Sequence, residues 1–377
     1  MTDHDGQTTV LGLMAGTSVD GIDAVMITTD GQNITRTGHA LTTAYEKSTI
    51  EAIFQRFDDP FADDDLAMRV ARDHARAAEM LIAKSGIIPD LIGFHGQTVY
   101  HAPEDKISLQ IGDAHYLAQR LGAPVIHDFR QNDLAHGGQG APLAPIYHQA
   151  LIKALHLPLP AALVNIGGIS NASIVKHNIQ ADGDDDLIGL DLGPGNALMD
   201  DLARRHLNQS YDKDGAFAAG GTACESLVDA MMTNTFFTLK GPKSLDRNGL
   251  YDLIPQDELS ALSEADRMAT FIAMTARAIV AGVTLNCPDI KAIVICGGGS
   301  LNPALMAAIK TAADGVDVSR SDDHMLGGMA LDSRFIEAEL IAYLAMRSQR
   351  GLPITFPATT GVDQPRTGGV RAKVKLK

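Results

Sequence analysis

Three apolar stretches of this chain run into glycine-rich loops, and this repeated pattern restricts the fold more than any other feature of the sequence. Long helical patterns lie between them, at residues 66–84 and 265–285. Strands that alternate with helices and end in glycine loops predict an α/β protein with binding sites at strand ends. The apolar stretches are Thr8–Met14, Ala162–Ile166 and Lys291–Cys296, and the loops after them contain Gly16, Gly167, Gly168, Gly297, Gly298 and Gly299.

The two halves of the 377-residue chain share one order of elements. Each half opens with a strand, a turn and a second strand, and each later has a strand, a loop and a helix. This order indicates a duplicated domain, although no repeat of individual residues is visible. A chain of this length is expected to form two or three domains with packed cores.

The composition is that of an ordinary soluble globular protein, with 45% hydrophobic and 20% charged residues. A formal charge of −15 argues against a nucleic-acid or membrane partner. The polar start MTDHDGQTT has no signal-peptide pattern, and no apolar run long enough to cross a bilayer is evident. We therefore expect a cytoplasmic protein. The three cysteines have neither disulfide nor zinc spacing.

The first glycine loop, GTSVDGID, lies between two β-rich stretches. Gly16 and Gly21 allow backbone N–H groups to approach a phosphate, and Thr17 and Ser18 add hydroxyl donors. The alternative is a plain hairpin turn, which Asp20-Gly21 favours because such turns need positive φ. The loop alone does not decide between these interpretations.

Two later loops, VNIGGISN and VICGGGSLN, again combine glycines with small polar residues after a strand. Each one alone is explained by a strand-to-helix turn, but three such loops in one chain favour a nucleotide site. The chain has no Walker loop and no early GxGxxG fingerprint. A nucleotide site in this chain must therefore use another architecture.

Seven motifs resemble, in order, those of the anhydro-N-acetylmuramic acid kinase family, within the actin, Hsp70 and hexokinase superfamily of ATP-binding proteins. They are GLMAGTSVDGIDAV, FHGQTVYH, SLQIGDA, DFRQNDLAHGGQGAPLAP, NIGGISN, LDLGPGNALMD and CGGGSLN. Flanking positions depart from the family pattern: Leu192 replaces a threonine, GGGSLN replaces GGGAHN, and GPKSLDRN replaces a PPKSTGRE-like stretch. Met14 also lies near the place where actin-like relatives have an acidic residue.

The resemblance implies two ribonuclease H-like (actin-like ATPase) α/β domains flanking an interdomain cleft. The expected first lobe contains residues 1–145 with about 347–377, and the second contains residues 146–346. The implied enzyme is an ATP-dependent kinase that opens the 1,6-anhydro ring of anhydro-N-acetylmuramic acid with water and phosphorylates O6. Its product would be N-acetylmuramic acid 6-phosphate, formed in peptidoglycan recycling. Whether the chain forms a homodimer stays open.

The same resemblance assigns ATP to the glycine loops and adds Mg²⁺, because phosphoryl transfer needs its charge neutralised. Asp20 is the candidate magnesium ligand, with Asp23 as the alternative. The expected ATP-binding residues are Gly16, Thr17, Ser18, Val19, Asp20, Gly21, Ile22, Asp23, Asn165, Gly167, Gly168, Gly297, Gly298 and Gly299.

Asp191 is the expected catalytic base. It directly follows the apolar stretch Leu187–Leu190, so burial should raise its pKa, and the GPGN after it predicts a tight loop. The alternative is an N-cap for a helix near Ala197, a role that Asn196 fits better. In the resembling family O6 is held in an acetal, so the base would activate water rather than a hydroxyl group.

An acidic sugar needs a local cation, and Arg130 is the candidate because a guanidinium group matches a carboxylate. A structural ion pair of Arg130 with Asp128 or Asp133 is the open alternative. Lys243 and Arg247 lie either near a loop that could face the second domain or in an ordinary solvated charge run. The other expected substrate-binding residues are His95, Gln97, Gln110, Asn196 and Glu337.

Two other functions remain as alternatives. One is a different kinase of the superfamily that acts on a hydroxyl or carboxylate. The other is a non-catalytic nucleotide-gated protein such as an actin-like filament or a chaperone. The HGQT, DFR and GQGAPL loops have no role in a filament or a chaperone, and they favour the kinase.

Overall fold

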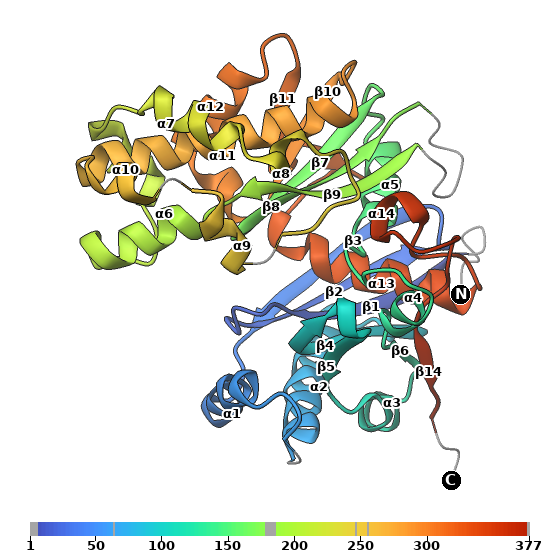
Figure 1. The fold of residues 1–377 in the computed structure, drawn as a ribbon. Helices are drawn as coiled ribbons and strands as arrows, with labels where there is room; N and C mark the ends of the chain where they lie inside the picture. The colour runs from blue at the N-terminus through green and yellow to red at the C-terminus, as the bar shows by residue number, and fades with distance from the viewer. Residues whose placement is uncertain (1–6, 63–64, 178–185, 246, 255, 375–377) are drawn as a thin grey trace. The chain divides into compact units, whose positions relative to one another are not determined.

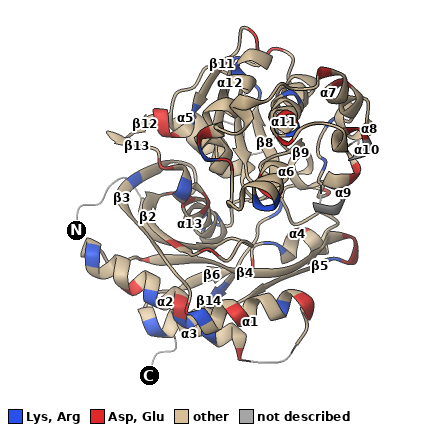
Figure 2. Cartoon of the chain, turned by 90° about the vertical axis from the view of Figure 1, so that its left-hand side faces the viewer, with Lys and Arg blue, Asp and Glu red and all other residues tan. Residues whose placement is uncertain are grey.

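The computed structural model describes residues 7–62, 65–177, 186–245, 247–254 and 256–374. The chain divides into two compact units, which are described separately (Figure 1). Unit 1 contains Met1–Ala154 and Met325–Lys377, and unit 2 contains Leu155–His324. Charged residues lie mainly on helices and loops rather than on strands (Figure 2).

Unit 1 is built on a seven-stranded mixed sheet with the order β14-β6-β4-β1-β2-β3, in which β5 pairs with β4. Strands β1 to β3 form an antiparallel meander, while β4 is parallel to β1 and β6 is parallel to β4. The strands are β1 Thr8–Ala15, β2 Ile22–Thr29, β3 Ile34–Thr43, β4 Leu91–Ala102, β5 Ile107–Ile111, β6 Val125–His127 and β14 Val370–Ala372, and a separate hairpin pairs β12 Met325–Leu326 with β13 Met329–Ala330.

Helices cover both faces of this sheet, with α2 and α3 on one face and α13 on the other (Figure 1). The α13 backbone lies against the sheet, because a Cβ atom added at Gly12 would come within 1.9 Å of the Ala338 carbonyl oxygen. The alternate residues Leu11 and Leu13 face the other way, into the core beneath α2. The helices are α1 Lys47–Asp58, α2 Leu66–Ser85, α3 Ala114–Leu121, α4 Gln131–Ala135, α5 Pro145–Ala154, α13 Ile336–Gln349 and α14 Pro357–Thr360.

Unit 2 repeats the same strand order. Its five-stranded sheet runs β11-β10-β7-β8-β9, with an antiparallel β7-β8-β9 meander and with β10 and β11 parallel to β7. Reversed, this order matches β3-β2-β1-β4-β6 of unit 1, including the strand directions. The expected pair of related ribonuclease H-like α/β domains is confirmed. The strands are β7 Ala161–Ile166, β8 Ile169–Val175, β9 Leu187–Pro194, β10 Ala292–Cys296 and β11 Asp317–Arg320.

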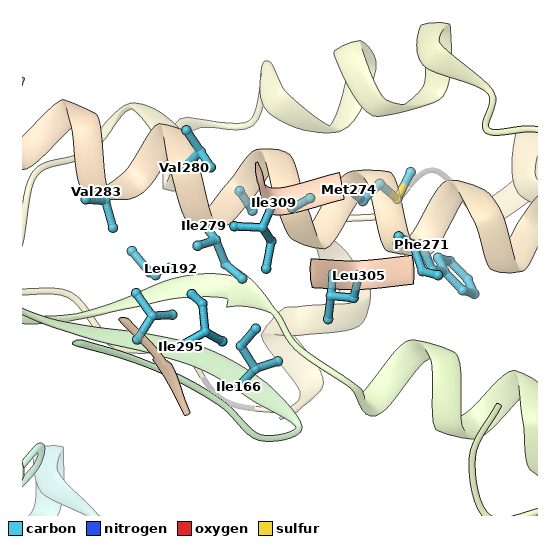
Figure 3. Close-up of a cluster of buried hydrophobic side chains, with 14 of the residues drawn as sticks. Ile166, Leu192, Phe271, Met274, Ile279, Val280, Val283, Ile295, Leu305 and Ile309 are labelled. Carbon is cyan, nitrogen blue, oxygen red and sulfur yellow. The ribbon is translucent and has the colours of Figure 1, made fainter. Parts of the chain in front are cut away.

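The core of unit 2 lies between one face of its sheet and the helices α11 and α12 (Figure 3). Side chains from three strands, Ile166, Leu192 and Ile295, point toward Ile279 of α11 and Ile309 of α12 (Figure 3). The helices are α6 Ala197–Leu202, α7 Glu225–Met232, α8 Thr235–Thr238, α9 Arg247–Asp252, α10 Gln256–Ser260, α11 Glu264–Asn286 and α12 Pro303–Ala312.

Helix α11 differs from the sequence expectation about apolar runs. Within the described residues it is the single helix long and apolar enough, by length and composition alone, to cross a membrane. Most of its apolar stretch is buried inside the protein. Its apolar side chains are accounted for by packing in the core of unit 2.

The expected domain boundaries also differ from those of the structure. Residues 325–346 were expected in the second lobe, but α13 packs on β1, β2 and β4 of unit 1. Helix α5 likewise belongs to unit 1, so the chain passes into unit 2 after Ala154 rather than after residue 145. The apolar pattern of α13 predicts a buried helix, but it does not indicate which of two similar sheets the helix covers.

Candidate functional site

The first glycine loop connects β1 to β2 and spans Gly16 to Gly21. The N–H of Val19 donates to the carbonyl of Gly16 at 3.2 Å, and Val19 itself has the positive φ of 58°. The predicted Asp20-Gly21 corner with positive φ is therefore wrong in detail. Glycine is required at position 21 for space, since a Cβ atom there would lie 2.9 Å from Cγ2 of Thr42.

Gln97 holds this loop from beneath. It is fully buried, and its Nε2 donates to the carbonyl of Gly16 at 3.1 Å and to that of Thr98 at 3.2 Å. Its Oε1 accepts from the hydroxyl of Tyr45 at 3.1 Å. Because these bonds occupy both ends of the amide, Gln97 positions the loop and has no free group for a sugar.

Strand β4 continues beyond its expected end. The sequence places His95 and Gln97 in a polar loop after Phe94, whereas both lie within the twelve-residue strand. The strand persists because β5 pairs with its second half. The predicted pocket residue Gln110 lies on β5, half-buried, and its Nε2 donates to hydroxyls of Thr98 and Ser108.

Arg130, which is partly buried, and His95, which is buried, are hydrogen-bonded in unit 1. Arg130 donates through one terminal nitrogen to the carbonyl of Gly140 at 2.7 Å and through the other to Nε2 of His95 at 3.0 Å. A guanidinium group can only donate, so His95 accepts at Nε2 and carries its proton on Nδ1, which lies 3.0 Å from the Gly96 carbonyl. Burial and the charge of Arg130 lower the pKa of His95 to about 3.

The alternative ion pair of Arg130 with Asp128 or Asp133 is absent among the described contacts. The carboxylate of Asp133 instead accepts from the N–H of Gly140 and the hydroxyl of Thr360. The Nε of Arg130 is buried and has no hydrogen-bond partner among the residues that the structure describes. Both terminal nitrogens of Arg130 are thus held by protein groups, while its Nε is enclosed.

Neighbouring carboxylates contribute to raised pKa values of Asp23 and Glu337 in unit 1. Asp20 lies exposed in the β1–β2 loop, and Asp23 on β2 accepts from the hydroxyl of Thr42 at 2.5 Å. Burial raises the pKa of Asp23, and the charge of Asp20 adds to that effect. Glu337 of α13 is accessible to solvent, but protein atoms around its carboxylate displace water. This desolvation raises its pKa, and the charge of Asp23 raises it further.

The loops after β7 and before α6 pack together in unit 2. The carbonyl of Gly167 accepts from the N–H of Asn196 at 2.7 Å, and that of Gly168 accepts from the N–H of Gly195 at 3.0 Å. The side chain of Asn196 donates to the carbonyl of Ile166 at 3.2 Å. Asn196 precedes α6 as expected, but its side chain forms no capping hydrogen bond.

The triple-glycine loop after β10 meets the same two loops. A Cβ atom on Gly297 would lie 2.2 Å from Oδ1 of Asn165, and one on Gly299 would lie 2.3 Å from a side-chain carbon of Ile166. Gly297 also has φ of 78°. The structure thus brings together the predicted unit 2 residues Asn165, Gly167, Gly168, Asn196, Gly297, Gly298 and Gly299.

Asp191 lies within β9 rather than after it, opposite Asn171 of β8. Its neighbours Leu190 and Leu192 face the core on α11, so the carboxylate is on the other face of the sheet. Burial raises the pKa of Asp191 to about 6, although the N–H of Leu245 and the charge of Lys243 oppose that shift. The N-cap interpretation of Asp191 is wrong, because Asn196 holds that position.

Lys243 is half-buried beside Asp191 and is not part of a solvated charge run. Its ammonium group donates to the carbonyl of Phe236 at 2.6 Å and lies 4.1 Å from the centre of that ring. Desolvation lowers the pKa of Lys243 to about 8. The sequence signalled this position only through its resemblance to a family motif.

Two residues that hold predicted site residues in place could not be identified from the sequence. Tyr45 orients Gln97 from a loop 52 residues earlier in the chain. Leu245 donates its backbone N–H to Oδ2 of Asp191 at 2.7 Å, a role that any residue except proline could fill.

Comparison with known proteins gives consistent matches along the chain. A sequence model of the family described as "Anhydro-N-acetylmuramic acid kinase" matches residues 8–373. A curated protein of that name from Rhodospirillum rubrum is 40% identical over 374 residues, covering 98% of this chain and 95% of the relative. One from Bradyrhizobium diazoefficiens is 39% identical over 378 residues, covering 97% and 99%. Among solved structures, the activator of the 2-hydroxyisocaproyl-CoA dehydratase from Clostridium difficile has a TM-score of 0.43 and 11% identity, covering 91% of this chain and 96% of that one.

Proposed function

Because this chain belongs to the anhydro-N-acetylmuramic acid kinase family, we propose that it opens the 1,6-anhydro ring of anhydro-N-acetylmuramic acid with water and phosphorylates O6 from ATP. The product is N-acetylmuramic acid 6-phosphate. The observation that carries this proposal is the Asp191 carboxylate, which has a raised pKa of about 6 and lies in the same unit as two converging glycine loops.

The reaction needs one base and no acceptor hydroxyl. Asp191 takes a proton from water as the water oxygen bonds to the anomeric carbon. The bond between that carbon and O6 breaks, O6 bonds to the γ-phosphorus, and ADP leaves. A base with a pKa of about 6 is ionised at neutral pH and still holds a proton well enough to assist the attack.

The nucleotide is assigned to the glycine loops. In unit 2, Gly297 and Gly299 have no side chain and so can lie directly against Asn165 and Ile166. The backbone of the glycine loop is therefore close to the ends of β7 and β10. In unit 1 the loop from Gly16 to Gly21 presents exposed Thr17 and Ser18. Backbone N–H groups and hydroxyls of this kind bind phosphate oxygens. Asn196, predicted to bind the sugar, is reassigned to the nucleotide loops that it contacts.

A magnesium ion at this site would need phosphate oxygens of the nucleotide as additional ligands. No group of three or more His, Cys, Asp or Glu side chains within the described parts of the chain is arranged to hold a metal ion. Mg²⁺ commonly binds one or two carboxylates together with substrate phosphates and water. The exposed carboxylate of Asp20 suits that role, and the bound ion would neutralise charge on the transferred phosphoryl group.

The sugar carboxylate is assigned to Arg130. This residue is partly exposed, and its guanidinium group is held in a fixed orientation by Gly140 and His95, so it provides a local cation in a chain of net charge −15. The sugar hydroxyls are assigned to Glu337, which is exposed, and to the partly buried Gln110, whereas His95 and Gln97 act through Arg130 and the β1–β2 loop. This division of roles revises the expected list of direct sugar contacts.

Isotope labelling tests the proposal. The protein is incubated with ATP, Mg²⁺ and anhydro-N-acetylmuramic acid in ¹⁸O-labelled water, and the product is weighed by mass spectrometry. We expect one ¹⁸O atom in the sugar phosphate, and D191N should abolish turnover while it still binds ATP. Unlabelled product, or full turnover by D191N, would reject the mechanism.

The cellular setting is a proposal of the same kind. A kinase for this substrate would act in the cytoplasm on fragments released from peptidoglycan, without a nucleic-acid or membrane partner. Loss of the protein should then cause the anhydro sugar to accumulate inside cells. Another kinase of the superfamily would instead consume ATP with a substrate that has a free hydroxyl or carboxylate.

A further inference from the structure

We propose that the segment Gly241–Leu245 is a positioning element for Asp191, which uses backbone groups to leave one carboxylate oxygen free to accept the proton. The proposal rests on the role of Asp191 as base, proposed above. It adds that a loop outside the sheet orients the carboxylate of that base.

The segment first fixes the backbone of Asp191. Strand β9 lies at the edge of the unit 2 sheet, where outward N–H groups lack a neighbouring strand. The N–H of Asp191 donates to the carbonyl of Lys243 at 2.9 Å, so the segment replaces the missing strand at this residue. The Cα atom that carries the carboxylate is therefore held on both sides, by β8 and by the segment.

The segment then fixes the carboxylate itself. The N–H of Leu245 donates to Oδ2 of Asp191 at 2.7 Å. Among the described residues, Oδ1 has no hydrogen-bond partner and it is not enclosed. One oxygen is thus committed to the protein and the other remains available, which is the arrangement that a base acting on water requires.

The segment is anchored at its start. The N–H of Gly241 donates to Oδ1 of Asn286 at 3.0 Å, and Asn286 is held in turn by the carbonyl of Gly282 on α11. A Cβ atom on Gly241 would lie 2.9 Å from Cβ of Leu190, so glycine allows the segment to lie flat against β9. The start of the segment is therefore fixed by contacts with Asn286 and with Leu190, the residue before Asp191. These contacts help to place the N–H of Leu245.

Lys243 supplies the nearby charge. Its ammonium group is held by the Phe236 carbonyl and ring rather than by the carboxylate, and its field favours the ionised form of Asp191. Helix α11 packs on the opposite face of β9, and its Arg277 pairs with Glu225 and Asp229. The other charged side chains of α11 lie in its first turn, and β8 presents the neutral Asn171 opposite the base.

The sharpest test removes the Leu245 N–H alone. Leucic acid in place of Leu245 converts the amide to an ester and preserves the side chain. The same replacement at Leu239, whose side chain is exposed and which forms no hydrogen bond with Asp191 among the described residues, is the matched control. We expect the Leu245 ester to lower kcat by about 10- to 100-fold and to raise the acidic pKa of the kcat/KM profile by about one unit, with KM for ATP unchanged.

Two outcomes separate this inference from the proposed function. If D191N is inactive but the Leu245 ester and the Leu239 ester have the same pH profile, the positioning role is overturned and the base survives. If D191N is active, the base assignment itself fails, whatever the esters do.

Side-chain variants provide a second test that does not depend on the ester folding well. K243M should raise the acidic pKa of the kcat/KM profile because the cation that favours the ionised base is lost. K243R should restore the profile at least in part, since it keeps the charge. Equal profiles for K243M and K243R would remove Lys243 from the positioning element.

Discussion

The Nε2 atom of His95 accepts a hydrogen bond from Arg130 at 3.0 Å, and this hydrogen bond orients the guanidinium group. Burial, together with the neighbouring guanidinium, lowers the pKa of His95 to about 3. The ring stays neutral at any pH near 7, so the contact is not a pH switch. Its role is to fix the orientation of Arg130.

The first prediction concerns this support. H95A should raise KM for anhydro-N-acetylmuramic acid about tenfold with a small change in kcat, because Arg130 loses a fixed orientation rather than its charge. Steady-state kinetics with the sugar as the varied substrate measures the effect. H115A removes an exposed histidine from α3 and should behave as the unaltered protein. A purely lowered kcat in H95A would contradict a role in binding.

The second prediction concerns pH. Asp191 must be ionised to accept a proton, and its pKa is raised to about 6, so kcat/KM should fall tenfold per pH unit below about pH 6. Asp200 has a similar raised pKa of about 6, which makes D200N the necessary control. The acidic limb should persist in D200N. If the acidic limb disappeared in D200N, the limb would belong to Asp200 and not to Asp191.

The third prediction compares two glycines with almost equal φ. Gly297 has φ of 78° and Gly315 has φ of 80°, but an added Cβ atom meets Asn165 at 2.2 Å in the first case and nothing within 4 Å in the second. G315A should lower stability by about 1 kcal/mol through backbone strain alone. G297A should lower it by about 2–4 kcal/mol and raise KM for ATP, because a backbone with ψ of 177° at this φ strains any other residue and because the loop must also move.

Urea unfolding and ATP kinetics on the two variants check this comparison. Both substitutions lie in unit 2, so the same transition reports on them. Equal losses of stability would mean that the Gly297 loop tolerates a side chain and does not need close contact with β7.

The fourth prediction concerns a buried ion pair of unit 1. Arg36 donates to Glu339 at 2.5 Å, and the other carboxylate oxygen accepts from Tyr147 at 2.7 Å. R36M leaves a buried carboxylate without its cation and should lower stability by about 3–5 kcal/mol. The double variant R36M/E339M should recover much of that loss, because both charges are removed together. Urea midpoints of the single and double variants measure the coupling, and simple additivity would contradict it.

The sequence predicted many local features well. Apolar runs located β1, β7 and β10, and period-3.6 patterns located α2 and α11 within one residue or so of their ends. Their physical basis is local: a strand or helix buries side chains at a fixed period, and that period is visible in the sequence. The glycines at 297 and 299 were predicted from the sequence to allow close contact with a ligand, and the structure shows that they also allow close contact with Asn165 and Ile166.

Continuation of a strand was less visible. His95 and Asp191 were predicted to follow strands, yet both lie inside them. A polar residue in a strand resembles the start of a loop unless the pairing partner is known. The partners here are β5 and β8, and a single sequence does not specify them.

The sequence by itself determined the α/β class, the duplicated order of elements and the glycine loops, and it proposed Asp191 as the base. Only the tertiary structure decided that α13 belongs to the first sheet, that His95 serves Arg130, and that the Leu245 N–H holds one oxygen of Asp191. The physical reason is that side-chain types and periods are encoded residue by residue. The partner of a backbone N–H or of a buried helix face is set by contacts between residues far apart in the chain.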